Sequence, residues 1–169
     1  MANTYTLINS NVLASSAASV TFSAIPATFT DLVIRASIRT DRAAVEDWLY
    51  IKFNGLTTNR SYTRLTGSGS AAASGRSTSV IVLGETNAAT STANTFSNQE
   101  IYIPSYTASQ NKPMSGIGMQ EDNTSAAYML VSAGLWRDTA AITEINLFPE
   151  TGPNFVTGSS FYLYGISNA

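Results

Sequence analysis

The 169-residue sequence contains no cysteine and no histidine. The absence of cysteine excludes disulfides and thiolate metal sites, and the absence of histidine removes the commonest metal ligand and general base. Because many common catalytic mechanisms depend on these two residues, most enzyme mechanisms are excluded for this chain. We expect no metal ion and no other cofactor.

Charge is also scarce. Charged residues make up 12% of the chain, and the formal net charge is -2. Such a chain has no basic surface for a phosphate backbone and no polybasic segment for an anionic membrane. We therefore expect that neither nucleic acid nor a membrane is a direct partner.

Long apolar runs are missing as well. No run approaches the roughly 20 residues of a membrane-spanning helix. The first residues, MANTYTLINS, lack the cationic start and the apolar core of a signal peptide. We expect a protein that is made and assembled without crossing a membrane, with one domain over residues 1–169.

The apolar residues that are present recur with a period of two. In TDLVIRASIRT, alternate residues from Leu32 to Ile38 are apolar, while Val33, Arg35 and Ser37 point the other way. In DWLYIKFNG, Leu49, Ile51 and Phe53 alternate with Trp48, Tyr50 and Lys52 in the same manner. This alternation is typical of a β-strand with one face in a core.

The same reading along the chain predicts strands separated by turn residues. The predicted strands are Thr4–Ala14, Ser19–Ala24, Leu32–Ile38, Trp48–Phe53, Arg60–Thr66, Thr78–Leu83, Thr95–Ile103, Lys112–Gln120, Ala126–Arg137, Ala141–Phe148 and Ser160–Ile166. Many short strands with regular turn signals predict an all-β antiparallel sandwich, and about 8 to 11 strands favour a jelly-roll-like arrangement.

Three further stretches have a local interpretation. Thr66–Ser79 and Gly84–Thr95 are close to low complexity, so we expect long hairpin loops there. The segment TDRAAVEDW predicts a short helical turn at most. Gly116 and Gly118 leave one strand face without side chains, which favours either a bulge or the close approach of another backbone.

No arrangement of residues predicts catalysis, and we expect that the protein is not an enzyme. The nearest carboxylate pairs, Glu46–Asp47 and Glu121–Asp122, stand beside turn residues and are expected to be solvated loop charges. A serine nucleophile would have to recruit one of the two lysines, and we expect no such pair. A calcium site at Glu121, Asp122 and Asn123 is an open alternative, because hard cations bind clustered loop oxygens.

Arginines and aromatic residues provide the candidate interface. Clustered arginines bind the carboxylates of a partner, and aromatic rings on an outer sheet face stack on sugars or anchor a protein contact. The alternatives are a solvated sheet face for the arginines and burial for the rings. The candidate interface residues are Arg35, Arg39, Arg42, Trp48, Tyr50 and Tyr106.

Five groups of segments, taken in order, resemble a recurrent small virion protein of tailed bacteriophages. They are FSAIPATFTDLVIRASIRTD, then IKFNG with SYTRLTGSGS, then IYIPSYTASQNKP, then GLWRDTAAITEINLF, and finally FVTGSSFYLYGI. The resemblance covers nearly the whole chain, and its specificity comes from the order of the segments. It implies a non-enzymatic β-sandwich structural protein and brings no catalytic motif.

The resemblance implies two functions. In the first, the protein is a capsid decoration (cement) protein on the capsid exterior, assembled in the host bacterial cytoplasm, which binds the major capsid protein and itself, as a homotrimer, and stabilises the mature lattice. In the second, it is a tail or fibre-associated module that binds a receptor or host glycan through rings such as Trp48 and Tyr106. The sequence has no heptad run or repeat that would build a fibre shaft, which favours the first.

Overall fold

All regular elements in the described part of the computed structural model are β-strands, and that part comprises residues 4–123 and 127–167. The strands are β1 (Tyr5–Val12), β2 (Val20–Phe22), β3 (Asp31–Ile38), β4 (Glu46–Phe53), β5 (Arg60–Gly67), β6 (Ala72–Ser77), β7 (Val82–Asn87), β8 (Ser97–Ile103), β9 (Lys112–Gln120), β10 (Tyr128–Trp136), β11 (Ile145–Pro149) and β12 (Ser160–Ile166). The described residues contain no helix that could span a membrane.

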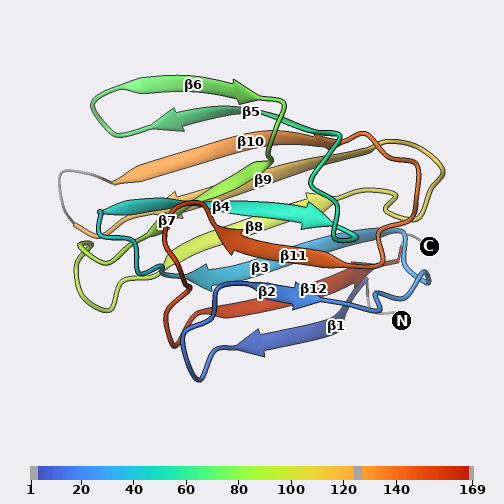
Figure 1. The fold of residues 1–169 in the computed structure, drawn as a ribbon, viewed down its shortest axis with the longest axis horizontal. Coiled ribbons are helices and arrows are strands. Elements are labelled where there is room, and N and C mark those ends of the chain that lie inside the picture. Colours follow the sequence, from blue (N-terminus) through green and yellow to red (C-terminus); the bar gives the residue numbers. More distant parts are fainter. Residues whose placement is uncertain (1–3, 124–126, 168–169) are drawn as a thin grey trace.

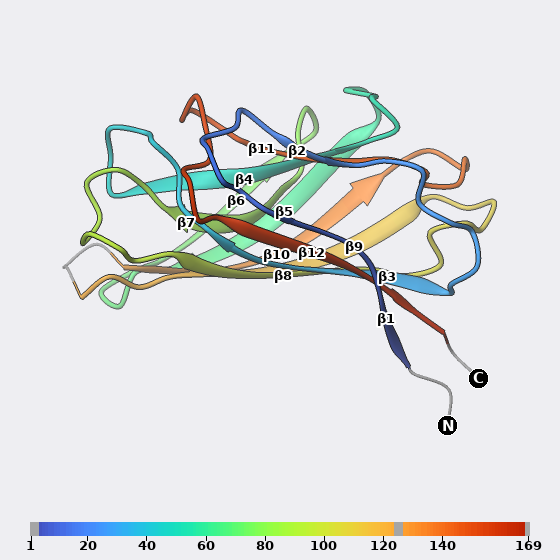
Figure 2. The ribbon, with the colours of Figure 1, turned by 90° about the horizontal axis from the view of Figure 1, so that it is seen from below.

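The strands form two antiparallel sheets that pack as a sandwich (Figures 1 and 2). The large sheet has the order β1-β12-β3-β8-β9-β10-β5-β6, and the small sheet has the order β2-β11-β4-β7. The predicted antiparallel β-sandwich is confirmed. The hairpins β5–β6 and β9–β10 extend the large sheet beyond β8, and Figure 1 shows β5 and β6 at its upper edge.

Without these two hairpins, the remaining strands have jelly-roll order. Four of them run β1-β12-β3-β8 in the large sheet and four run β2-β11-β4-β7 in the small sheet. Successive strands then alternate between the sheets, except that β4 and β7 are neighbours in the small sheet; this is the double Greek key of a jelly roll. We call β1, β12, β3 and β8 the jelly-roll half of the large sheet, and β9, β10, β5 and β6 the inserted half.

The core lies between the two sheets and follows the predicted alternation. On β3, the side chains of Leu32, Ile34 and Ile38 are fully buried. On β4, the side chains of Leu49, Ile51 and Phe53 are fully buried, while the alternate residues from Glu46 to Lys52 are half-buried. The assignment of faces on both strands is confirmed.

Beneath the inserted half, the sheets meet backbone to backbone. A Cβ atom added to Gly116 would lie 2.3 Å from the carbonyl oxygen of Leu83, and one added to Gly118 would lie 2.6 Å from the Cα atom of Gly84. The pairing of β9 with both neighbours runs without a register shift. Of the two interpretations of these glycines, the close approach of another backbone is confirmed and the bulge is wrong.

Two local predictions differ from the structure. β6 lies inside Thr66–Ser79, which was expected to be a loop. Its side chains are mostly small and exposed, so its pairing with β5 leaves no apolar period. β7 begins four residues later than Thr78 and continues to Asn87, because glycine and polar residues occupy its buried positions. The segment from Thr40 to Trp48, where a short helical turn at most was expected, contains bridges, bends and the start of β4.

Candidate functional site

The outward side of the inserted half carries exposed aliphatic and thioether side chains. Met119 of β9 stands directly opposite Met129 of β10, and Val131 stands opposite both Ile117 and Leu65. Each of these five side chains has between 42% and 58% of its surface exposed. We call Leu65, Ile117, Met119, Met129 and Val131 the aliphatic face; it contains no charged residue.

The polarity of β9 is inverted. Its buried positions hold Lys112, Met114, Gly116, Gly118 and Gln120, whereas Ile117 and Met119 are exposed. In a strand of an isolated sandwich, the larger apolar side chains normally point toward the core. The inversion arises because the inward side must remain flat for the backbone of β7.

A polar boundary lies beside the aliphatic face. A shallow groove of about 330 Å³ runs between Ile117 and Met119 on one side and Arg35, Asn98 and Glu100 on the other. The Nε atom of Arg35 donates to Glu100 at 3.0 Å, and both side chains are more than half exposed. The apolar surface therefore ends at an ion pair at the start of the jelly-roll half.

The three candidate arginines do not form a cluster. Arg35 lies on the outward side of β3, whereas Arg39 and Arg42 lie in the connection from β3 to β4. The guanidinium of Arg39 donates to the carbonyl oxygens of Ala89, Ser91, Thr92 and Thr95, so it holds the loop after β7. Arg39 is thus engaged within the chain and not arranged as a clamp for a partner.

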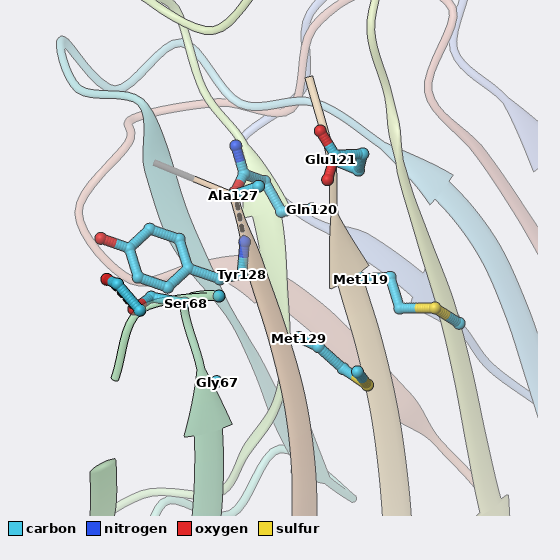
Figure 3. Close-up of a pocket in the computed structure, with 10 residues that line it drawn as sticks. Gly67, Ser68, Met119, Gln120, Glu121, Ala127, Tyr128 and Met129 are labelled. Atoms are coloured by element: carbon cyan, nitrogen blue, oxygen red, sulfur yellow. Dashed lines mark hydrogen bonds between the residues drawn. The ribbon is translucent and has the colours of Figure 1, made fainter. Parts of the chain in front are cut away.

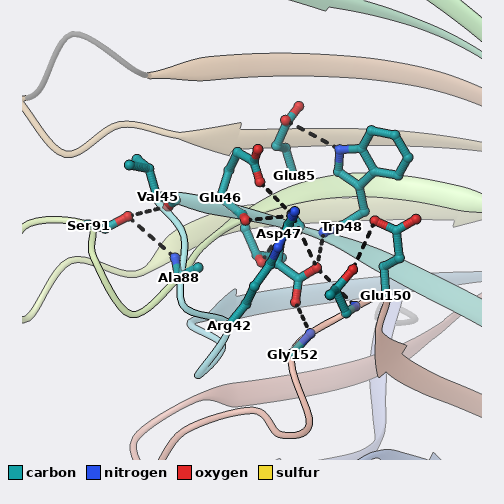
Figure 4. A network of polar contacts seen from close by, with 12 residues as sticks. Arg42, Val45, Glu46, Asp47, Trp48, Glu85, Ala88, Ser91, Glu150 and Gly152 are labelled. Atoms are coloured by element: carbon teal, nitrogen blue, oxygen red, sulfur yellow. Dashed lines mark hydrogen bonds and ion pairs between the residues drawn. The ribbon is translucent and has the colours of Figure 1, made fainter.

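Arg42 belongs to a polar network at the end of the small sheet (Figure 4). Its Nη1 atom contacts Glu46 at 2.8 Å and Asp47 at 3.9 Å. Asp47 is fully buried, and its carboxylate accepts hydrogen bonds from the backbone N–H groups of Thr151 and Gly152. The expectation that Glu46 and Asp47 are solvated loop charges is wrong for Asp47, which fixes the loop after β11.

The two candidate rings on β4 are half-buried and partly engaged. The guanidinium of Arg64 lies 3.8 Å from the centre of the Trp48 ring, and the indole N–H donates to Glu85 at 3.4 Å. The hydroxyl of Tyr50 donates to Glu150 at 2.5 Å, and partial burial together with this hydrogen bond raises the pKa of Tyr50. One face of Trp48 is thus already covered by a cation of the same chain.

Tyr106 is fully buried in the core, and its hydroxyl donates to the carbonyl oxygen of Pro26. Its ring is therefore not available at the surface of the folded chain. Of the two alternatives left open by the sequence, burial is the one that the structure shows for Tyr106. The residue lies in the turn after β8, where it was a candidate for a ring at the interface.

The second carboxylate pair and the calcium alternative concern the segment after β9. Asp122 is 3% exposed and accepts a hydrogen bond from the backbone N–H of Thr92, so it is not the solvated charge that was expected. Glu121 is exposed and accepts from the backbone N–H of Asn123 at 2.8 Å. Within residues 4–123 and 127–167, no three acidic side chains converge in a group that could hold a metal ion.

One serine does stand three residues before a lysine, in the segment Ser109-Gln110-Asn111-Lys112. Lys112 is fully buried, and its ammonium donates to the carbonyl oxygens of Ala108 and Gln110 at 2.7 and 2.5 Å. Carbonyl oxygens of Asp138 and Thr139 lie within 3.5 Å. This lysine holds two loops together, and its protons are directed at backbone acceptors.

The aliphatic face was not among the residues predicted from the sequence. A signal for it exists, since Gly116 and Gly118 mark the side of β9 that another backbone approaches, and Ile117 and Met119 alternate with them. Adjacent residues of a strand point to opposite faces, so these two side chains must point away from the small sheet.

Comparisons of the chain with protein-family models, with curated proteins and with solved structures gave no match.

Proposed function

We propose that this protein is a non-enzymatic virion structural protein, a capsid decoration protein that binds and stabilises the mature capsid lattice of a tailed bacteriophage. The proposal comes from the resemblance of the sequence and is supported by the character of one surface. In this proposal the aliphatic face contacts the major capsid protein, and copies of the chain meet one another as a homotrimer on the capsid exterior.

The aliphatic face is the observation that carries the proposal. Five apolar side chains that are roughly half exposed together present on the order of 450 Å² of apolar surface, which is similar to the apolar share of one side of a standard protein interface. The largest apolar patch of a typical monomeric protein has about this size and is often functional. Because the face carries no charge, its contact would depend on apolar burial more than on salt.

The alternative function, glycan or receptor binding by a tail module, depended on aromatic rings. Tyr106 is buried, and Arg64 covers one face of Trp48. The aliphatic face contains no aromatic ring, and aliphatic side chains do not provide the flat ring faces on which sugars stack. Exposed rings, Tyr5 and Tyr102, lie on the jelly-roll half. These observations favour the decoration role, and glycan binding is retained as an outcome of the test.

The test is a deletion phage examined in two assays. A decoration protein binds the mature lattice and stabilises it by mass action, by about 2.7 kcal/mol per site when its free concentration is 100 times its dissociation constant. We expect particles without the protein to package DNA but to lose it at a lower temperature or under osmotic stress, with unchanged adsorption to cells. Normal heat resistance with failed adsorption would establish the receptor role instead.

Variants make the test specific for the surface. Purified protein added to deletion particles should restore heat resistance, and the substitution Val131→Lys should abolish the restoration because it places a charge in the centre of the aliphatic face. Ser10→Lys is the matched control, since Ser10 is exposed on β1 at the other end of the same sheet. Equal restoration by both variants would assign lattice binding to another surface.

A further inference from the structure

A pocket of about 590 Å³ adjoins the aliphatic face at the end of the inserted half (Figure 3). It lies between the turn from β5 to β6 and the adjacent ends of β9 and β10. Residues 67–70 form one wall, and Met119, Gln120, Glu121, Tyr128 and Met129 line the rest together with Ala127. The pocket shares side chains with both β9 and β10.

The pocket continues directly from the aliphatic face. Met119 and Met129 stand opposite each other and belong to both. Methionine side chains are flexible and polarizable, and they adapt to apolar groups of different shape. A chain segment that covers the aliphatic face would therefore reach the pocket without leaving the apolar surface.

The opposite wall is held in place by local hydrogen bonds. The backbone N–H of Ser68 donates to the carbonyl oxygen of Ala71 at 2.9 Å, and the backbone N–H of Ala71 donates to the Ser68 hydroxyl at 3.2 Å. Figure 3 shows the ring of Tyr128 beside Ser68. The wall is thus a closed turn with a ring against it, and it leaves the space over Gly67 open.

Gln120 borders the pocket from the inward side of β9. The residue is 1% exposed, and its Oε1 atom accepts from the backbone N–H of Tyr128 at 3.1 Å. Its Nε2 atom has no hydrogen-bond partner among the described residues. This nitrogen is itself buried, so it does not face a segment bound against Met119 and Met129, and the pocket offers that segment an apolar surface.

Glu121 gives the pocket its charge. It lies just beyond the end of β9 in Figure 3, and it is the one charged side chain among the described residues that line the pocket. A carboxylate at the rim of an apolar pocket attracts a cation on the segment that enters and repels an anion. The preferred segment therefore combines an apolar side chain with a neighbouring lysine or arginine.

We propose that this pocket is an anchor site for an apolar side chain of a protein partner, with a lysine or arginine next to that side chain. The inference rests on the proposed function, in which the aliphatic face covers the capsid lattice, and it names the chemistry of the lattice segment. Anchors of this kind contribute most of the binding free energy of an interface.

The test uses the full chain and three capped dipeptides. N-acetyl-Phe-Lys-amide is the probe, N-acetyl-Phe-Glu-amide reverses the neighbouring charge, and N-acetyl-Gly-Lys-amide lacks the anchor. NMR of isotope-labelled methionine methyl groups should show shifts at Met119 and Met129, while Met114, which is 4% exposed on the inner side of β9, stays unchanged. The Lys probe should bind at least about threefold more tightly than the Glu probe.

Two substitutions by phenylalanine decide whether the pocket is responsible. Gly67→Phe introduces a ring at the wall of the pocket, and its Cβ atom meets no atom within 4 Å. It should weaken binding of the Lys probe by about tenfold or more. Thr63→Phe is the control on the same strand, exposed and outside the pocket, and should change binding by less than about twofold. Glu121→Gln should make the Lys and Glu probes equal.

Three results would overturn the proposal. Equal binding of the glycine and phenylalanine probes would show that the apolar side chain does not anchor the segment. If the Met119 and Met129 signals shift with protein concentration in the absence of a probe, the pocket binds a second copy of the chain. If Val131→Lys abolishes rescue of heat resistance and Gly67→Phe preserves it, the pocket is not an anchor while the decoration role stands. Probe binding with unaltered heat resistance of deletion particles would instead contradict the decoration role and leave the pocket a binding site.

Discussion

Two valines on the outward side of the large sheet show how its halves differ. Val33 of the jelly-roll half stands opposite Tyr102 and Tyr164, and it is 3% exposed although it points away from the core. Val131 of the inserted half stands opposite Ile117 and Leu65 and is 48% exposed. The jelly-roll half covers its outward valine with its own rings, whereas the inserted half leaves its valine without cover.

The inward sides differ in the same direction. The jelly-roll half packs through fully buried aliphatic side chains such as Leu32 and Ile34. The inserted half packs through Gly116 and Gly118 and through hydrogen bonds such as that from the Ser132 hydroxyl to the Val82 carbonyl oxygen at 2.6 Å. The jelly-roll half thus packs mainly through aliphatic side chains. The inserted half combines close backbone contact with a few buried side chains, such as Leu130 and Trp136, and leaves the aliphatic face outside.

The largest effect should follow from a side chain placed between β9 and β7. Gly116→Val puts a Cβ atom 2.3 Å from a backbone oxygen that cannot move away without disturbing β7, so we expect a loss of more than about 4 kcal/mol in the free energy of unfolding. Gly67→Ala is the control on the same sheet, since its Cβ meets open space. Urea unfolding measures both, and similar small losses would mean that the sheets do not meet through their backbones.

A buried carboxyl group at the same junction should make stability depend on pH. Glu85 of β7 is 3% exposed, and burial raises its pKa to about 7 from an ordinary value of 4.5, while Glu46 adds to the rise and Trp48 and Arg64 oppose it. The neutral form is thus favoured in the folded chain. Its stabilisation is fully present below about pH 4.5 and is lost as the pH rises through about 7.

The substitution Glu85→Gln removes this titration. We expect the variant to be more stable than the wild type at pH 9, by up to about 3 kcal/mol, and to show no such advantage at pH 4.5. Thermal unfolding at both pH values measures the difference. Glu100→Gln is the control, because Glu100 is exposed on the outward side of β8. An advantage of Glu85→Gln that is equal at both pH values would contradict ionisation as its cause.

The two valines themselves give an intermediate effect. Val33→Ala removes contacts with two flanking rings and should cost about 1 to 2 kcal/mol, whereas Val131→Ala should change the free energy of unfolding by less than about 0.5 kcal/mol. If the aliphatic face contacts the lattice as proposed, the order should reverse in deletion particles, since only Val131→Ala would then remove a lattice contact. Equal stability losses in the isolated protein would show that the inserted half also covers its outward face.

The sequence predicted the elements of the jelly-roll half well because burial there selects apolar side chains at alternate positions. Leu32, Ile34 and Ile38 leave no doubt about which side of β3 faces the core. The same reasoning located β9 but gave no direction for it, since its inward positions hold two glycines, a lysine and a glutamine. The order of strands in the sheets depends on contacts distant in sequence, and no local period encodes it.

The candidate site could be predicted only in part, for a related reason. Arg39 and Asp47 bind backbone groups of loops that follow other strands, and Tyr106 bonds to a carbonyl 80 residues before it. The sequence does not indicate whether a charged or aromatic side chain in a loop contacts solvent, its own chain or another protein. The aliphatic face, by contrast, follows from local alternation once the glycines are known to face β7.

The smallest effect concerns the ion pair at the boundary between the two halves. Arg35 and Glu100 are joined at 3.0 Å, but 57% and 52% of their side chains are exposed, so water screens their attraction. A double-mutant cycle with Arg35→Gln and Glu100→Gln should give a coupling of at most about 0.5 kcal/mol, and less in 1 M NaCl. A coupling above about 1.5 kcal/mol would make the pair part of what holds the sheet together. A small coupling would mean that the ion pair contributes little to stability. Its position indicates another role, because two charges beside Ile117 keep that end of the sheet hydrated and confine apolar contact to the inserted half.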